Sequence, residues 1–230
     1  MTRYRLYAHR NSYAMTTHLL LEELAVDYDI VWFNVHKPDQ FPPEFLQLNP
    51  HGRVPVLLTP HGPVYESAAT MVYLSECHGS RYLPSSTGQQ RALAFQWLFY
   101  LMSTFQPEVL IQFHPEKYFP TNKAMQDSLK KSSLSNLQVI WQKINQALDP
   151  GPYFLGDDYS LCDMLFIMQA IWAENQPPTF DNLPNISRMM RKVLVRPAVR
   201  SILRIHQVEH LVDFAKLDDQ KKSFSAEALT

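Results

Sequence analysis

The sequence predicts an α/β domain followed by an all-α domain. Strand and helix patterns alternate through residues 1–79, and a stretch containing Gly, Pro and Ser at 80–88 indicates a linker. Beyond it strand patterns nearly vanish, and helical spacing runs through residues 89–215. The chain has 230 residues, 46% of them hydrophobic, which is enough apolar material for two compact domains. Residues 216–230 are polar and aperiodic, and we expect a loose tail there.

The N-terminal elements follow from their apolar spacing. The first strand–helix–strand unit implies two parallel strands with a right-handed crossover, and a later hairpin adds antiparallel strands. Together they predict a mixed four-stranded sheet flanked by helices. Asn11 and Ser12 are residue types that favour the N-cap of the first helix. The expected strands are Tyr4–Ala8, Tyr28–Asn34, Val54–Leu58 and Val64–Tyr65, and the expected helices are Tyr13–Ala25, Pro42–Leu48 and Ser67–Cys77.

The C-terminal half is predicted to be helical throughout. Ser160 and Asp163 have the spacing of a capping box, which marks the start of a helix. Proline and glycine separate the helical stretches from one another. The expected helices are Gln89–Phe113, Lys123–Leu148, Leu161–Ala173, Ile186–Val195 and Ala198–Leu211.

Composition excludes several classes of function. The formal net charge of −1 provides no electrostatic reason to expect nucleic acid or an anionic membrane as a partner. No apolar run reaches the ~18–20 residues that span a bilayer. Cys77 and Cys162 fit no disulfide or zinc spacing, and the nine histidines show no paired ligand spacing, so we expect no metal site. A cytoplasmic location is the default expectation.

The first segment that carries chemistry is N-P-H-G-R-V-P-V-L, residues 49–57. Pro55 stands at the mouth of a strand, where a trans proline is awkward. A cis Val54–Pro55 bond would turn the chain tightly and leave the Val54 N–H and C=O facing outward. An extended peptide could then pair with this edge as an extra strand. The alternative interpretation is an ordinary turn.

Two further segments place polar groups at helix starts. The free N–H groups that begin the helix after Glu66, with the Ser67 hydroxyl, can hold a carboxylate, and the Glu66 carboxylate can pair with an ammonium. An α-amino acid head group carries both charges. A thiol beside Asn11 or Ser12, at the start of the first helix, would have its thiolate form stabilised and its pKa lowered. Simple N-capping is the alternative for both segments.

In combination these segments resemble the glutathione transferases. The matching pieces are N-P-x-G-R-V-P-V-L, Y-E-S-x-A-x-x-x-Y-L and, on the first helix, L-L-L-E-E-L. Farther along the chain, G-D-x-Y-S-L-C-D and Arg196-Pro197-Ala198-Val199 also match, so that the resemblance runs from about residue 4 to residue 210. The family resemblance implies a thioredoxin-like N-terminal domain. The segment D-Q-F-P-P-E-F-L from Asp39 resembles the bacterial nu class and the fungal Ure2-like branch.

The resemblance also implies a set of glutathione contacts. The Gln40 side chain would contact glutathione, the Val54 backbone would pair with its cysteinyl part, and Glu66 with Ser67 would hold its γ-glutamyl end. Arg53 and Pro55 belong to the same motif and complete the expected glutathione site.

The catalytic position departs from the family pattern. Members usually carry Tyr, Ser, Cys or Thr near the start of the first helix. Counting back from Glu22-Glu23-Leu24 selects Asn11, whereas counting forward from Tyr7 selects Ser12. An amide N–H or a hydroxyl could each stabilise the thiolate, so both residues remain candidates, with Asn11 favoured because insertions within a helix are costly.

The resemblance implies an enzyme that activates glutathione, its co-substrate, for attack on an electrophilic small molecule, as in detoxification. Two alternatives stay open: glutathione-dependent disulfide reduction, and a catalytically weak glutathione-binding or regulatory module. A homodimer is also implied. The second substrate would lie between the domains, near the aromatic residues of the first C-terminal helix and a break that contains His114, Glu116 and Lys117.

Overall fold

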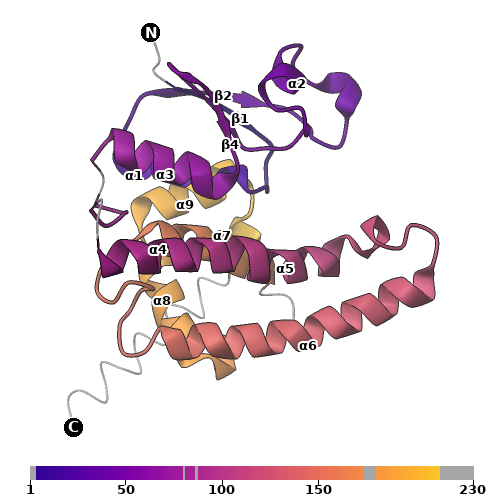
Figure 1. The fold of residues 1–230 in the computed structure, drawn as a ribbon, viewed down its shortest axis with the longest axis vertical. Coiled ribbons are helices and arrows are strands. Elements are labelled where there is room, and N and C mark those ends of the chain that lie inside the picture. Colours follow the sequence, from indigo (N-terminus) through magenta and orange to yellow (C-terminus); the bar gives the residue numbers. More distant parts are fainter. Residues whose placement is uncertain (1–3, 80, 86–87, 174–179, 213–230) are drawn as a thin grey trace.

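The computed structural model describes residues 4–79, 81–85, 88–173 and 180–212. Figure 1 shows a small sheet with its helices packed against one side of a larger group of helices. The predicted tail at 216–230 lies outside the described residues.

The N-terminal part contains one four-stranded sheet in the order β2-β1-β3-β4. β1 (Tyr4–Ala8) and β2 (Tyr28–Trp32) are parallel. β3 (Val56–Thr59) pairs antiparallel with β1, and β4 (Gly62–Tyr65) pairs antiparallel with β3. The predicted mixed sheet is confirmed, although β3 begins two residues later than expected.

Alternation along β1 divides the apolar residues between two layers. Leu6 and Ala8 point into the main core, while Tyr7 joins Phe45 and Val56 in a separate cluster. Successive strand residues face opposite sides of a sheet, so both faces of this sheet are covered by apolar side chains. β1 is therefore buried on both faces.

Three helices accompany the sheet. α1 (Ala14–Leu24) contacts α3 (Ser67–Cys77), and α1 also contacts helices of the C-terminal region. α2 (Phe45–Leu48), preceded by the 3-10 turn η1 (Pro38–Gln40), lies apart from them, with Phe45 in the second cluster (Figure 1). The predicted helix from Pro42 starts later because the Pro42 carbonyl accepts the Phe45 N–H in a turn just before it.

The expected N-caps of α1 are not observed. Tyr13 occupies the N-cap position and makes no side-chain capping bond. Ser12 Oγ accepts the Ala14 N–H at 3.2 Å, and Asn11 lies outside the helix with a positive φ of 51°. The first helix therefore starts one residue later than predicted, because Ser12 turns back towards His9 instead of opening the helix.

Helices make up most of the C-terminal region, as predicted. The Ser160 N–H and hydroxyl both bind Asp163 Oδ2, which confirms the predicted capping box. In chain order the elements are α4 (Gln89–Tyr100), η2 (Leu101–Phe105), α5 (Gln106–Phe113), η3 (Pro115–Lys117), α6 (Lys123–Ala147), α7 (Leu161–Ala173), η4 (Phe180–Asn182), α8 (Pro184–Leu194), α9 (Pro197–Ile205) and η5 (Glu209–Leu211).

Two predicted helices are interrupted. The stretch from Gln89 to Phe113 contains the π-helical turn η2, which is followed by Pro107. Proline has no N–H, and its ring clashes with the carbonyl of the preceding turn, which favours the wider winding of η2 just before it. The last predicted helix ends at Ile205 rather than Leu211, and Gln207 takes a positive φ of 61°.

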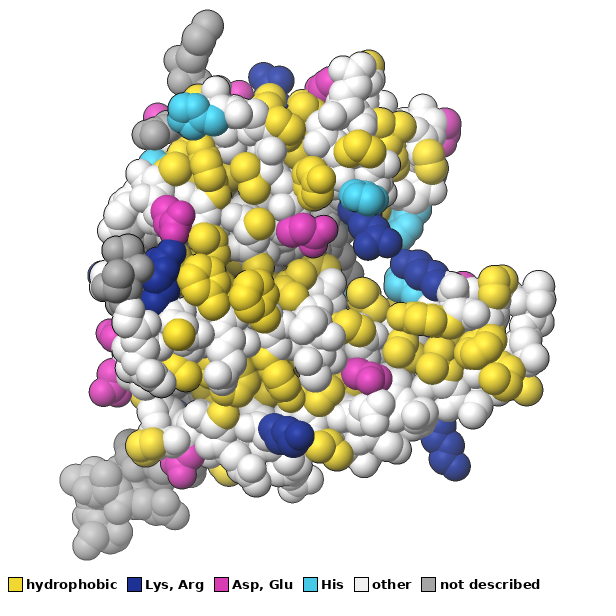
Figure 2. All heavy atoms as spheres, viewed as in Figure 1, with side chains coloured by type: hydrophobic (Ala, Val, Ile, Leu, Met, Phe, Trp, Pro, Cys, Tyr) yellow, Lys and Arg dark blue, Asp and Glu magenta, His cyan; other side chains and the backbone are white. Residues whose placement is uncertain are grey.

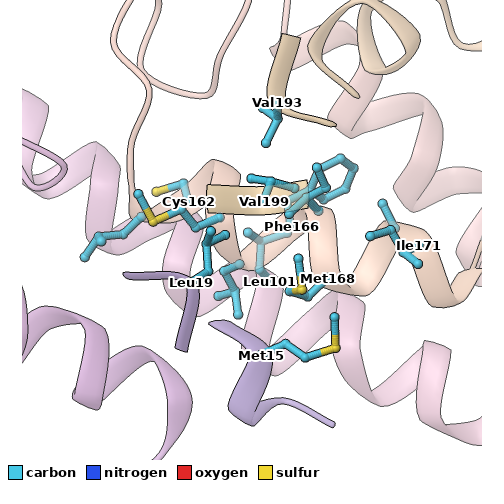
Figure 3. Close-up of a cluster of buried hydrophobic side chains, with 14 of the residues drawn as sticks. Met15, Leu19, Leu101, Cys162, Phe166, Met168, Ile171, Val193 and Val199 are labelled. Carbon is cyan, nitrogen blue, oxygen red and sulfur yellow. The ribbon is translucent and has the colours of Figure 1, made fainter. Parts of the chain in front are cut away.

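The two parts share one continuous core. Met15 and Leu19 of α1 pack with buried side chains of α7 such as Phe166 (Figure 3). Residues 161–171 of α7 are buried without exception, as expected for a helix enclosed on all sides. The helical region thus supports the segment that leads from β1 into α1.

Candidate functional site

The sheet register brings three predicted segments to one edge. Tyr7 of β1 pairs with Val56 of β3, and Val56 pairs with Tyr65 of β4. The loop after β1, the peptide before Val56 and the start of α3 after Tyr65 therefore lie side by side. These segments contain the predicted catalytic and binding residues except Gln40.

The segment before β3 has an unpaired peptide group. The Val54–Pro55 bond is cis, as predicted, and Pro55 is buried. No hydrogen bond to the Val54 N–H or C=O is present within the described ranges. The buried Asn49 side chain shapes the preceding loop, because its Nδ2 donates to the Arg53 carbonyl at 2.8 Å. Arg53 itself is exposed.

The start of α3 presents uncommitted polar groups. Glu66 is exposed and stands at the N-cap with φ 70°, yet its carboxylate makes no capping bond. A non-glycine residue in such a conformation is strained by roughly 1–3 kcal/mol, which is common at functional sites. Ser67 follows it, with its side chain buried. The N–H groups of the first turn of a helix have no partner within the helix, and such groups can bind an anion.

The Asn11 side chain is held by a residue of the C-terminal region. Its Oδ1 accepts the indole N–H of Trp172, in the last turn of α7, at 2.6 Å. An indole N–H can only donate, so the amide oxygen faces Trp172 and the amide nitrogen faces away. No partner for Asn11 Nδ2 occurs among the described residues, so its two N–H groups are available to a ligand.

Ser12 has its proton engaged in the loop. The Ser12 hydroxyl donates to the His9 carbonyl at 2.6 Å and accepts the Ala14 N–H at 3.2 Å. A hydroxyl has a single proton, so Ser12 cannot donate to a ligand without breaking the bond to His9. Of the two candidates, Asn11 is the one whose donors have no partner among the residues that the structure describes.

Gln40 approaches the same edge from the sheet's other face. It ends η1 and is exposed. The next residue, Phe41, packs its ring against Gly52, whose φ of 63° is readily tolerated only by glycine. The loop of Gln40 therefore adjoins the loop of Arg53.

Two residues near Asn11 were not singled out from the sequence. Trp172 contacts Tyr13 edge-on, with 4.7 Å between ring centroids. The Tyr13 hydroxyl oxygen is fully buried. Burial raises the Tyr13 pKa well above its usual value of 10, with the Gln169 side chain acting in the opposite direction. Nothing local in the sequence predicts the Asn11–Trp172 contact, because the two residues are 161 positions apart.

A recess separates the two parts of the molecule on one side. Figure 2 shows it opening as a notch, with histidine and Lys or Arg side chains on both of its sides. Of the expected pocket residues, Phe105 is buried in the core, whereas Phe99, Phe113 and Tyr118 are exposed. His114 binds Glu116 at 3.1 Å in the break after α5. The aromatic residues therefore divide between core and surface.

No group of three metal-ligating side chains occurs in the described ranges. None of the helices in these ranges is both long enough and apolar enough to cross a membrane. Cys77 and Cys162 are both free.

A family model described as the glutathione S-transferase, N-terminal domain, matches residues 2–76. That range contains every predicted contact residue and the sheet edge where most of them meet. Residues 2–76 therefore match the N-terminal domain of the glutathione S-transferases. Among the relatives of the chain is the disulfide-bond oxidoreductase YfcG of Escherichia coli, which is 28% identical over 154 residues, or 64% of this chain and 69% of that protein.

Solved structures of glutathione transferases share the fold. One is a glutathione transferase homologue from Sulfitobacter with bound glutathione: TM-score 0.78, 20% identity, covering 88% of this chain and 97% of that one. Another is the glutathione transferase URE2P8 from Phanerochaete chrysosporium with oxidised glutathione: TM-score 0.80, 18% identity, covering 93% and 99%. The thioredoxin-like domain followed by a mostly helical region is therefore the transferase fold.

Proposed function

We propose that this protein binds glutathione at the sheet edge and activates its thiol for attack on an electrophilic small molecule. The observation that carries the proposal is the Asn11 amide, just before α1, whose nitrogen has no hydrogen-bond partner among the described residues. Donation from Asn11 Nδ2 would favour the thiolate of bound glutathione. The thiolate then forms a bond to the electrophilic carbon, and the leaving group departs with its electron pair.

The remaining groups suit the two ends of the peptide. The unpaired Val54 peptide group would receive the cysteinyl backbone as an added strand. Glu66 would pair with the γ-glutamyl ammonium, while Ser67 and the first N–H groups of α3 would hold its carboxylate. Gln40 and Arg53 adjoin this cradle from the neighbouring loops.

A second candidate function is glutathione-dependent disulfide reduction. The name of the Escherichia coli relative favours it. In that reaction the thiolate would attack a disulfide sulfur and release the other sulfur as a thiolate. A second glutathione would then resolve the mixed disulfide. The binding site and the activating donor would be the same.

One panel of assays at fixed glutathione tests these functions. Turnover of an aryl halide supports conjugation, and turnover of hydroxyethyl disulfide supports reduction. Calorimetric binding of glutathione without either turnover would indicate a catalytically weak binding module. Absence of binding would refute the proposal as a whole.

A further inference from the structure

The contact between Asn11 and Trp172 joins the loop after β1 to helix α7 of the C-terminal region. Trp172 lies in the last turn of α7, the most enclosed helix of the C-terminal region. Its indole Nε1 is 2.6 Å from Asn11 Oδ1. This is a short bond for an N–H donor and a carbonyl oxygen.

The bond controls which end of the amide reaches a ligand. The terminal torsion of asparagine is broad and roughly two-fold, so an unrestrained amide can present either its oxygen or its nitrogen. The oxygen would repel a thiolate, whereas the nitrogen would donate to it. Because indole has no acceptor, Trp172 binds only the amide oxygen and leaves the nitrogen for the ligand.

Trp172 is itself restrained. Its ring packs edge-on against Tyr13, with 4.7 Å between centroids and 78° between planes. Tyr13 stands at the N-cap of α1, two residues after Asn11, and its hydroxyl oxygen is buried. The backbone at Asn11 has φ 51°, a conformation that asparagine tolerates better than most residues. Loop, tyrosine and tryptophan thus form one packed unit.

We propose that Trp172 is a positioning residue, which orients the Asn11 amide so that its N–H groups face the glutathione thiol. This inference rests on the proposed function. It assigns to the C-terminal region a direct part in activating the thiol. Trp172 acts through Asn11 and need not touch glutathione.

The test is the pKa of the bound glutathione thiol, followed by thiolate absorbance as the pH is changed. Trp172→Phe keeps an aromatic ring against Tyr13 and removes only the N–H side of the indole. We expect the bound thiol pKa to rise by about one unit. Affinity for S-methylglutathione, which has no thiol to ionise, should change by less than about twofold, since an effect confined to the thiolate leaves this ligand untouched.

Trp141→Phe is the matched control. Trp141 lies in α6 of the same region, and its Nε1 is buried without a hydrogen-bond partner among the described residues. The substitution removes the same atoms without removing an N–H contact to the loop. The thiol pKa should stay at the wild-type value in this variant.

A double-mutant cycle decides whether Trp172 acts through Asn11. Adding Trp172→Phe to Asn11→Ala should change the thiol pKa no further, because the amide to be oriented is already absent. A full additional shift in the double variant would overturn the inference, as would an unchanged pKa in Trp172→Phe when Asn11→Ala alone shifts it. Absence of glutathione binding to the wild type would instead refute the proposed function.

A second measurement covers the case in which Trp172→Phe fails to fold. In the wild-type protein with isotope-labelled indole, the Trp172 N–H should exchange slowly with solvent, and it should lose this protection in Asn11→Ala. Fast exchange in both proteins would overturn the inference.

Discussion

At the scale of single residues, this chain carries an amide, that of Asn11, where the glutathione transferases that it resembles usually carry a hydroxyl or a thiol. An amide is compatible with thiol activation because its nitrogen has no hydrogen-bond partner in the described part of the chain. The neighbouring hydroxyl is not available in the same way, since Ser12 donates to the His9 carbonyl.

We therefore expect Asn11→Ala and Ser12→Ala to differ. Loss of a hydrogen bond to a charged group costs about 1.5–3 kcal/mol, so Asn11→Ala should raise the bound thiol pKa by roughly one to two units. Ser12→Ala should leave that pKa in place. Thiolate absorbance against pH in the two glutathione complexes measures this. A shift confined to Ser12→Ala would reverse the assignment.

Glu66 allows a second residue-scale prediction. Glu66→Ala should weaken glutathione binding roughly ten- to a hundredfold, because it removes a charge-assisted bond to the γ-glutamyl ammonium. Its folding should be unaffected, since the side chain is exposed and makes no capping bond. Calorimetry provides the affinity. Asp127→Ala, which removes an exposed carboxylate on α6, is the control, and equal affinity in all three proteins would show that the site is misplaced.

At the scale of elements, α1 is fastened to the region of α9 by two polar contacts. In the first, Glu23 of α1 receives two bonds of 2.8 Å from Arg196, the residue before α9, and Tyr82 donates to Glu23 at 2.9 Å. Arg196 also covers the Tyr159 ring, 4.0 Å from its centroid. The hydrogen bonds to Glu23 raise the Arg196 pKa well above its usual value.

Breaking this contact should destabilise the fold. The Glu23 and Arg196 side chains are only 8% and 26% exposed, so Glu23→Ala leaves a half-buried arginine without its partner. We expect a loss of about 2–3 kcal/mol in the free energy of unfolding. Denaturant titration measures it, with Asp127→Ala as the exposed-pair control at under about 0.5 kcal/mol. Equal losses in the two variants would contradict the prediction.

The second contact is a buried pair of histidines. His18 Nδ1 lies 3.0 Å from Nε2 of His206, the residue after α9. His18 Nε2 lies 2.6 Å from the Tyr28 hydroxyl, which donates to Glu22. His18 Nε2 must therefore donate to Tyr28, and its Nδ1 accepts from His206. Burial lowers the His18 pKa to about 4, and the Glu22 carboxylate acts in the opposite direction. Burial also lowers the His206 pKa, which His18, Arg10 and His9 lower further.

This pair predicts a pH-dependent stability. Below about pH 6.5 the histidines are protonated in the unfolded chain but stay neutral in the folded protein. The free energy of unfolding is therefore highest above this pH and decreases as the pH falls. Unfolding free energies at about pH 5 and about pH 7 should differ less in His206→Asn than in the wild type. Buried Asp163, whose pKa burial raises to about 6, contributes with the opposite sign, but equally in both proteins. An unchanged difference would refute the role of the pair.

At the scale of the whole molecule, we expect a two-fold homodimer. Each part of the chain contributes exposed large aromatic side chains, among them Phe99 of α4 at 65% and Tyr65 of β4 at 37%. Burying such side chains against a second copy would favour association. Sedimentation at micromolar concentration should show a dimer, which Phe99→Glu weakens and Val139→Glu on α6 does not. A wild-type monomer would contradict the expectation.

Local pattern was enough for the order of elements, the mixed sheet, the cis Val54–Pro55 bond and the capping box of α7. Each depends on residues close in sequence, such as Ser160 and Asp163, or on the spacing of apolar side chains. The same pattern misplaced the start of α1 and did not reveal the π-helical turn before Pro107, because hydrogen-bond choices within a few residues decide both.

The resemblance to the glutathione transferases and the expected glutathione contacts follow from the sequence itself, because short continuous motifs carry them. The preference for Asn11 over Ser12 as the proposed thiol donor comes from tertiary structure. Trp172 orients the Asn11 amide, and Arg196 and His206 fasten α1 to the end of the chain, each across more than a hundred residues. Contacts of that range depend on how the two regions pack, and no local spacing encodes them.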